Sequence, residues 1–185
     1  MYFFVLTGHA QESTIDIQNI TKVTVFQLGI SHEHRVGKLQ SLYLQPYMKS
    51  GVSFSYSSSF GTKSYVFSDP AITAQYRYYY NAARRLTKGK QTNRNNLNYI
   101  AAYSEAVFYH EKSTGWRTIY TIGPVWGIQR NYESRFSLDF NLGTGFYFGK
   151  GWIESFNDLP RIGNVSGFDL ILQINIGFWL GSKRK

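Results

Sequence analysis

The feature that most constrains this chain is an alternation of apolar and polar residues, with a period of two, that dominates it from about position 21 onward. In Arg135 to Phe148, large apolar residues recur at every second position, joined by Thr144, and Ser, Asp, Asn, Gly and Tyr stand between them. Phe168 to Leu180 repeats the arrangement with seven large apolar residues on one face. Successive side chains of a strand point to opposite faces, so the pattern predicts β-strands with two chemically different faces.

Five more segments carry strand patterns of similar length: Val23 to Arg35, Gln40 to Tyr56, Ala71 to Asn81, Asn98 to Tyr109 and Thr118 to Arg130. Each has about ten residues or more, the length of a tilted transmembrane strand. Seven strands are an odd number, whereas single-chain bacterial barrels have an even one. An eighth arises if the first segment splits near Gly29 into Gln18 to Phe26 and Gly29 to Arg35; it could also lie in a long loop or before the first residue.

The polar face decides between a soluble sandwich and a membrane barrel. It carries Gly, Ser, Asn and Gln with isolated charges, and charged residues make up only 17% of the chain. A solvent-facing sheet would carry more Lys and Glu, so we expect the polar face to line a narrow lumen. We therefore predict an all-β fold, an antiparallel up-and-down transmembrane β-barrel of eight strands. Four charged residues are expected to pair in a structural lumen network, since buried charges persist when paired: Glu33, Arg77, Glu105 and Asp139.

The chain divides into four predicted parts. Residues 1–10 read as a partial signal peptide that ends at Ala10. Residues 11–20 form a lead segment, 21–181 the barrel domain and 182–185 a basic C-terminal tail.

The predicted connections alternate in length. Short turns are expected at Val36 to Lys38 and Asn131 to Ser134, and long extracellular loops at Ser57 to Asp69 and Gly149 to Gly167. The exception is Ala82 to Asn96, a long connection on the periplasmic side. It contains a basic periplasmic loop formed by Arg84, Arg85, Lys88, Lys90 and Arg94. This loop is interpreted as a solvated turn, with attraction to anionic head groups or a cell-wall polymer as the alternative. Because the net charge of +9 is confined to loops and termini, no nucleic-acid partner is expected.

Aromatic residues are abundant, with 15 Tyr and 14 Phe. Aromatic side chains gather at headgroup depth in membrane barrels. The predicted aromatic girdle consists of Tyr76, Tyr78, Tyr80, Trp126 and Trp179.

One stretch, Ser31-His32-Glu33-His34, contains residue types used in metal binding and nucleophilic hydrolysis. Neighbours along a strand point to opposite faces, so Ser31 and His32 are not expected to cooperate. The absence of cysteine excludes disulfides and thiolate zinc sites. No catalytic, cofactor-binding or metal-binding residue is predicted.

Two resemblances add to this interpretation. The segment from Gln173 to Leu180 resembles the terminal-strand signal that the barrel-assembly machinery recognises in outer-membrane proteins, although a polar tail follows it here. Pro70 to Lys90, Ile122 to Gly127 and Leu138 to Gly143 resemble uncharacterised outer-membrane β-barrel proteins of Bacteroidota. The resemblance covers most of the chain after Thr21. It implies a small eight-stranded outer-membrane barrel and brings no activity or active site with it.

The expected function is that of a non-enzymatic barrel in the outer membrane of a Gram-negative bacterium, with a structural role or a binding or adhesion role carried by the long loops. Its expected partners are outer-membrane lipids and, during insertion, the barrel-assembly machinery. Two alternatives remain: an outer-membrane lipid-modifying hydrolase of the lipid A deacylase type, and a soluble lipocalin-like carrier whose apolar face lines a ligand cavity.

Overall fold

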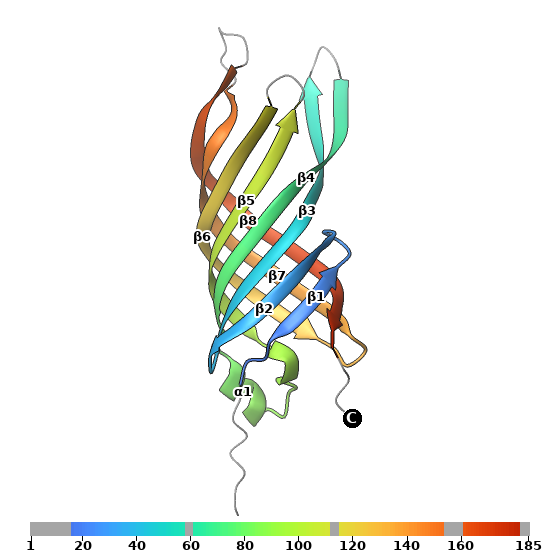
Figure 1. Cartoon of the computed structure of the whole chain (residues 1–185), viewed down its shortest axis with the longest axis vertical. Helices are drawn as coiled ribbons and strands as arrows, with labels where there is room; N and C mark the ends of the chain where they lie inside the picture. The colour runs from blue at the N-terminus through green and yellow to red at the C-terminus, as the bar shows by residue number, and fades with distance from the viewer. Residues whose placement is uncertain (1–15, 58–60, 112–114, 154–160, 182–185) are drawn as a thin grey trace, which may run out of the picture.

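The protein folds into one closed antiparallel barrel of eight strands, in which each strand pairs with its neighbour in sequence and β1 pairs with β8 (Figure 1). The computed structural model describes residues 16–57, 61–111, 115–153 and 161–181. The strands are β1 (Ile20–Thr24), β2 (Gly29–Gly37), β3 (Gln40–Ser57), β4 (Gly61–Tyr78), β5 (Asn98–Glu111), β6 (Gly115–Asn131), β7 (Phe136–Ile153) and β8 (Arg161–Leu180). The predicted all-β, eight-stranded up-and-down barrel is confirmed.

The eighth strand comes from the split of the N-terminal segment. β1 and β2 form a short hairpin joined by a turn over residues 25–28. The two strands pair from Thr24 opposite Gly29 down to Ile20 opposite Glu33. The break falls next to Gly29, as one of the sequence alternatives had it. The backbone of Gly29 lies so close to Pro46 and Tyr47 of β3 that a Cβ atom at this position would clash with them.

The prediction of long loops at Ser57 to Asp69 and Gly149 to Gly167 is wrong, because the strands extend far into both ranges. The β3–β4 ladder continues through Ser50 opposite Ser68 to the ends of both strands, and β7 and β8 pair as far as Ile153 opposite Arg161. Backbone hydrogen bonds continue each ladder through residues that do not alternate with a period of two, so the sequence pattern gives no strand signal there. Residues 58–60 and 154–160 lie outside the described residues.

The connection from Ala82 to Asn96, expected to be a loop, contains the short helix α1 (Ala82–Thr87) and a 3-10 turn over Asn93–Asn95. It lies across the end of the barrel where β1 begins and β8 ends (Figure 1). Asn95 and Gln18 exchange two hydrogen bonds there, of 2.8 and 2.9 Å. The lead segment is therefore packed from residue 16 onward, with Ile17 buried, and the first strand begins at Ile20. The predicted signal peptide (1–10) and tail (182–185) lie outside the described residues.

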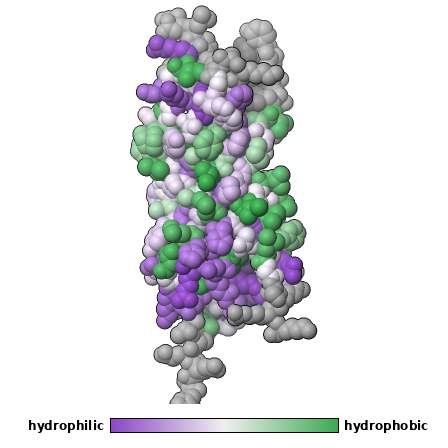
Figure 2. All heavy atoms as spheres, viewed as in Figure 1, coloured by the Kyte–Doolittle hydropathy of each residue, from purple (hydrophilic) through white to green (hydrophobic). Residues whose placement is uncertain are grey.

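Inside and outside of the barrel have opposite chemistry. The buried side chains are mostly polar and include Gln45, Arg77, Gln129 and Asn141, each 0% exposed. Large apolar side chains point outward instead, among them Leu172, which is 57% exposed. In Figure 2 hydrophobic residues lie over the middle of the barrel, and hydrophilic ones gather at the α1 end. This reverses the arrangement of a soluble globular domain.

Candidate functional site

The centre of the lumen is an ion pair between Arg77 of β4 and Asp139 of β7. Arg77 Nη1 donates to Asp139 Oδ2 at 2.8 Å, and both side chains are buried. The guanidinium lies between two tyrosine rings, 3.7 Å from the centroid of Tyr43 and 4.2 Å from that of Tyr99. Tyr99 also donates to Asp139 Oδ1 at 2.6 Å. Stacking between aromatic faces and pairing with a carboxylate together fix the guanidinium across the lumen.

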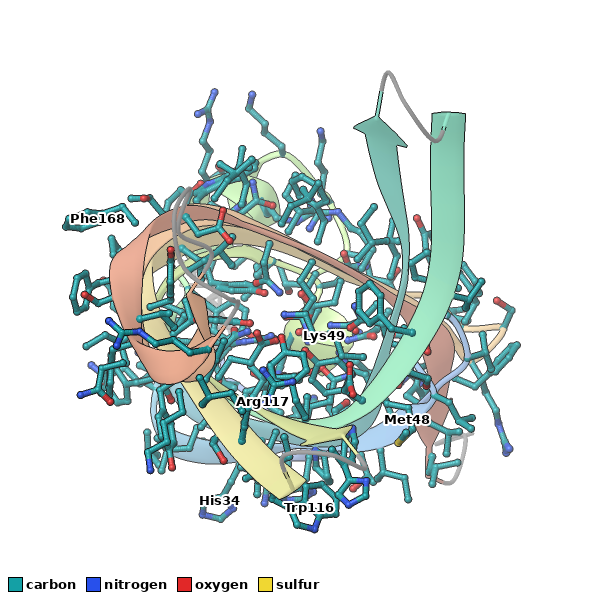
Figure 3. The ribbon with its side chains drawn as sticks, turned by 90° about the horizontal axis from the view of Figure 1, so that it is seen from above. His34, Met48, Lys49, Trp116, Arg117 and Phe168 are labelled. Carbon is teal, nitrogen blue, oxygen red and sulfur yellow. The ribbon has the colours of Figure 1, made fainter. Side chains whose placement is uncertain are left out.

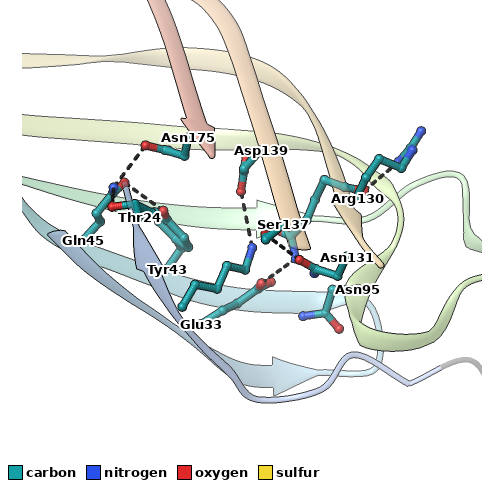
Figure 4. A network of polar contacts seen from close by, with 12 residues as sticks. Thr24, Glu33, Tyr43, Gln45, Asn95, Arg130, Asn131, Ser137, Asp139 and Asn175 are labelled. Atoms are coloured by element: carbon teal, nitrogen blue, oxygen red, sulfur yellow. Dashed lines mark hydrogen bonds and ion pairs between the residues drawn. The ribbon is translucent and has the colours of Figure 1, made fainter. Parts of the chain in front are cut away.

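Glu33 of β2 joins the same network through Gln129. Arg77 Nη1 donates to Gln129 Oε1 at 2.7 Å, and Gln129 Nε2 donates to Glu33 Oε2 at 3.0 Å. Ser41 donates to the other carboxylate oxygen at 2.6 Å, and the Tyr79 hydroxyl donates to it as well. Figure 4 shows Glu33 and Asp139 facing this space from different strands. The structure thus brings three of the four predicted lumen residues together.

Glu105 of β5, the fourth, lies in a second cluster. It pairs with Lys49 Nζ at 2.6 Å and accepts hydrogen bonds from the hydroxyls of Tyr47 and, at 3.0 Å, Tyr103. Lys49 points into the barrel in the view of Figure 3. The lumen therefore holds two polar clusters in place of the one network that the sequence suggested.

Lys22 is the residue of the central cluster that the sequence reasoning missed. Its side chain is 3% exposed, and its Nζ lies 3.9 Å from Asp139 Oδ2. With Lys22 included, two cations face two carboxylates, so the central cluster is neutral in formal charge. The signal is present, because Ile20, Lys22 and Thr24 share one buried face of a short strand, but the first strand segment predicted from the sequence begins only at Val23.

Tyr79 closes the central cluster at the α1 end, one residue beyond β4. It is fully buried and its ring packs edge-on against Tyr99, with the centroids 5.5 Å apart. Burial, followed by the neighbouring Glu33 carboxylate, raises the pKa of Tyr79 well above its usual range. The phenol therefore stays protonated and donates to Glu33.

Trp179 contradicts its assignment to the aromatic girdle. It is 4% exposed, donates from Nε1 to the Tyr132 carbonyl at 2.8 Å, and lies under the Arg94 guanidinium, 4.4 Å from the ring. It occupies an inward position of β8, the face shared with Asn175 and Gln173. Its role is to pack the barrel end.

The other four girdle residues lie outside the barrel. Tyr76, Tyr78, Tyr80 and Trp126 are 44, 41, 46 and 37% exposed. Trp126 Nε1 donates to the Tyr80 hydroxyl at 2.7 Å. They lie on the half of the barrel near α1, because β4 ends at Tyr78 beside that helix.

The five residues predicted to form a basic periplasmic loop divide into two groups. Arg84, Lys88 and Lys90 are exposed. Arg85 instead donates to the Gln91 carbonyl at 3.0 Å, and Arg94 stacks on Trp179. Two of the basic side chains therefore hold the connection in place, and three face solvent.

The Ser31 to His34 cluster is divided between the two faces of β2. Ser31 and Glu33 are buried inside, while His32 and His34 are exposed outside, as the label of His34 in Figure 3 shows. His32 Nδ1 shares a 2.9 Å hydrogen bond with the Thr21 hydroxyl. In the described parts of the chain, no three His, Asp or Glu side chains lie close enough to hold a metal ion.

Among the described residues no helix is long and apolar enough to cross a membrane. Comparison with known proteins finds no matching family model, no matching curated protein and no matching solved structure.

Proposed function

We propose that this chain is an outer-membrane β-barrel of a Gram-negative bacterium with a structural or binding role and no catalytic one. The observation that carries the proposal is the reversed polarity of the wall. Only in a lipid environment is it favourable to expose an apolar row such as Phe168, Leu170 and Leu172 while burying charged side chains inside.

The same observation disfavours a soluble lipocalin-like carrier. Such a carrier would place its apolar face around an internal ligand cavity. Here Gln45, Arg77 and Gln129 fill the corresponding space with hydrogen-bonded polar groups.

The packed lumen supports a role other than free passage of solutes. Arg77, Tyr79, Tyr99 and Gln129 are all 0% exposed in its α1 half, and α1 and the 3-10 turn lie across the end. An eight-stranded barrel has an interior just wide enough for side chains. In the proposed orientation the α1 end is periplasmic, and the β3–β4, β5–β6 and β7–β8 hairpins project outside the cell, where a rigid scaffold presents them for binding. Outer-membrane lipids and the barrel-assembly machinery are the proposed partners.

The test is to refold the chain from Gln11 onward in detergent micelles and in plain buffer. We expect a folded species in micelles whose gel mobility changes on heating, and aggregation in buffer. A monomer that is stable in buffer without detergent would contradict the membrane assignment.

Orientation is tested on intact cells. An epitope tag inserted between β3 and β4 should be accessible to antibody, and the same tag inserted between Lys88 and Gly89 should be accessible only after permeabilisation. The reverse result would overturn the proposed orientation.

A further inference from the structure

The barrel wall is incomplete above the first hairpin. On one side the last bond from that hairpin to β8 runs from Val25 N–H to the Ile176 carbonyl, at 2.8 Å. On the other side the last bond to β3 runs from Met48 N–H to the Leu28 carbonyl, also at 2.8 Å. Beyond these points no strand pairing to the facing edges of β3 and β8 is found among the described residues. Figure 1 shows the short β1–β2 hairpin ending well below the other hairpins.

The edge of β8 at this gap has free backbone groups. The N–H and C=O of one strand residue point the same way, and alternate residues point to opposite neighbours. Because the Ile176 carbonyl faces β1, the N–H and C=O groups of Ile174, Leu172 and Leu170 face the gap. The Leu170 N–H donates to the adjacent Asp169 Oδ1 at 2.8 Å, where a neighbouring strand would otherwise accept it.

This edge lies within the outward apolar row. Phe168, Leu170 and Leu172 are 81, 65 and 57% exposed, so lipid would reach β8 at the gap. Across the gap, β3 turns polar after Met48, with Lys49 and Ser50. Unpaired backbone groups are tolerated at membrane depth only where they line a polar, hydrated space.

Such a space lies directly behind the gap. It is a cavity of about 80 Å³ lined by residues of β3, β5, β6, β8 and the first turn, including Lys49, Glu105 and Gln173. Leu170 and Leu172 line it too, although they belong to the outward face of β8. The backbone groups of these two residues face the gap, so the cavity reaches the free edge of β8.

The charges of the cavity indicate what it would bind. Lys49 is 36% exposed at its side chain and pairs with the buried Glu105, while Asp169 is exposed and makes no ion pair with the described residues. The Lys49 ammonium has three N–H donors and gives one to Glu105, so a phosphate can accept from another, and the exposed Asp169 carboxylate complements an amine. A water molecule occupies roughly 30 Å³ in the liquid. A cavity of about 80 Å³ therefore admits the charged tip of a group that carries both a phosphate and an amine, and not a whole lipid.

We propose that this gap is a lateral binding site for a phospholipid whose head group carries a phosphate and a primary amine. The phosphate lies near Lys49 and the free N–H groups of β8, the amine near Asp169, and the acyl chains lie outside over Leu170 and Phe168. The inference rests on the proposed membrane location.

Native mass spectrometry tests it on the folded barrel, reconstituted with equal amounts of phosphatidylethanolamine, phosphatidylglycerol and phosphatidylcholine and then transferred to mild detergent. We expect one retained phosphatidylethanolamine per barrel. Asp169→Asn should lower its retention about tenfold, since a charge-assisted hydrogen bond is lost. Lys49→Met should lower it as well. Glu133→Gln and Lys150→Met, which remove exposed charges away from the cavity, should leave retention unchanged.

Asp169→Asn keeps the test valid if Lys49→Met fails to fold, because Asp169 is exposed and its amide oxygen can still accept from Leu170. Retention of no lipid, equal retention of all three lipids, or unchanged retention by Asp169→Asn would each overturn the proposal. A barrel that folds only in detergent yet retains no lipid contradicts this site alone. Stable folding in plain buffer contradicts the membrane location itself.

Discussion

At the scale of the residue, Asp139 is the carboxylate of the central cluster that pairs with both of its buried cations. It accepts from Arg77 and Tyr99 at 2.8 and 2.6 Å, and the Lys22 ammonium lies 3.9 Å away. Glu33 is supported mainly by neutral donors, such as Ser41 and Gln129. Two buried cations therefore depend on Asp139 for compensation, and removal of one partner from a buried pair leaves the other uncompensated.

The change Asp139→Asn is expected to destabilise the folded barrel by about 3–5 kcal/mol. The cause is the positive charge of Arg77 and Lys22 that stays buried without its counter-ion. Urea unfolding in micelles, followed by tryptophan fluorescence, measures the effect, with exposed Glu133→Gln as the control. A loss below about 1 kcal/mol would show that water or relaxation compensates the two cations.

Tyr79→Phe removes one hydroxyl donor from Glu33 without changing the packed ring. We expect a loss of about 1–3 kcal/mol, since hydrogen bonds to charged groups are worth more than neutral ones. The matched control is Tyr80→Phe, whose hydroxyl is on the exposed outer face. Equal losses for the two variants in the same urea titration would argue against a special role for the buried phenol.

At the scale of the element, the connection from Ala82 to Asn96 is a packed closure of the barrel end. Leu97 is fully buried in an apolar cluster with Ile17, Tyr79, Ala82 and Tyr99, among others. This small cluster is the only buried hydrophobic group at the α1 end that the described residues form, and it anchors both the lead segment and α1. A basic composition such as that of residues 84–94 favours a solvated loop, which is why the sequence pattern did not reveal the closure.

Leu97→Ala should therefore cost about 2–5 kcal/mol, the range for truncating a buried leucine. Leu86→Ala, on α1 but 39% exposed, should change stability by less than about 1 kcal/mol. Thermal gel-shift midpoints in micelles compare the two. If Leu86→Ala is the more damaging change, the helix contributes more through its outer face than through the apolar cluster.

At the scale of the whole molecule, the outward apolar row of β7 runs from Phe136 to Phe148 and ends at Lys150, and that of β8 runs from Leu180 to Phe168 and ends at Ser166. The two rows lie side by side because Phe136 pairs with Phe178 and Phe146 with Phe168. The proposed membrane location rests on this belt on the outside of a closed wall.

Leu142→Arg places a charge in the middle of this belt. In phospholipid vesicles it should destabilise the barrel by about 2–4 kcal/mol, the cost of an arginine at bilayer midplane. Glu133→Arg, in the turn between β6 and β7, should be close to neutral. A neutral Leu142→Arg would mean that the belt does not face hydrocarbon.

The sequence by itself determined the all-β class and the inward and outward faces, because side-chain alternation is a local property with a period of two. It offered the break near Gly29 as one of three sources of the eighth strand, and the structure decided between them. It also pointed to Arg77, Asp139 and Glu33 as inward residues. Tertiary structure alone decided which charges meet: Lys22 reaches Asp139, and Glu105 pairs with Lys49, because register and closure set those distances. It also decided the lengths of the hairpins, where backbone pairing continues beyond the alternating segments. It decided the gap beside β8 as well, because the early ends of β1 and β2 leave part of that edge without a neighbouring strand, and no local sequence pattern reports this.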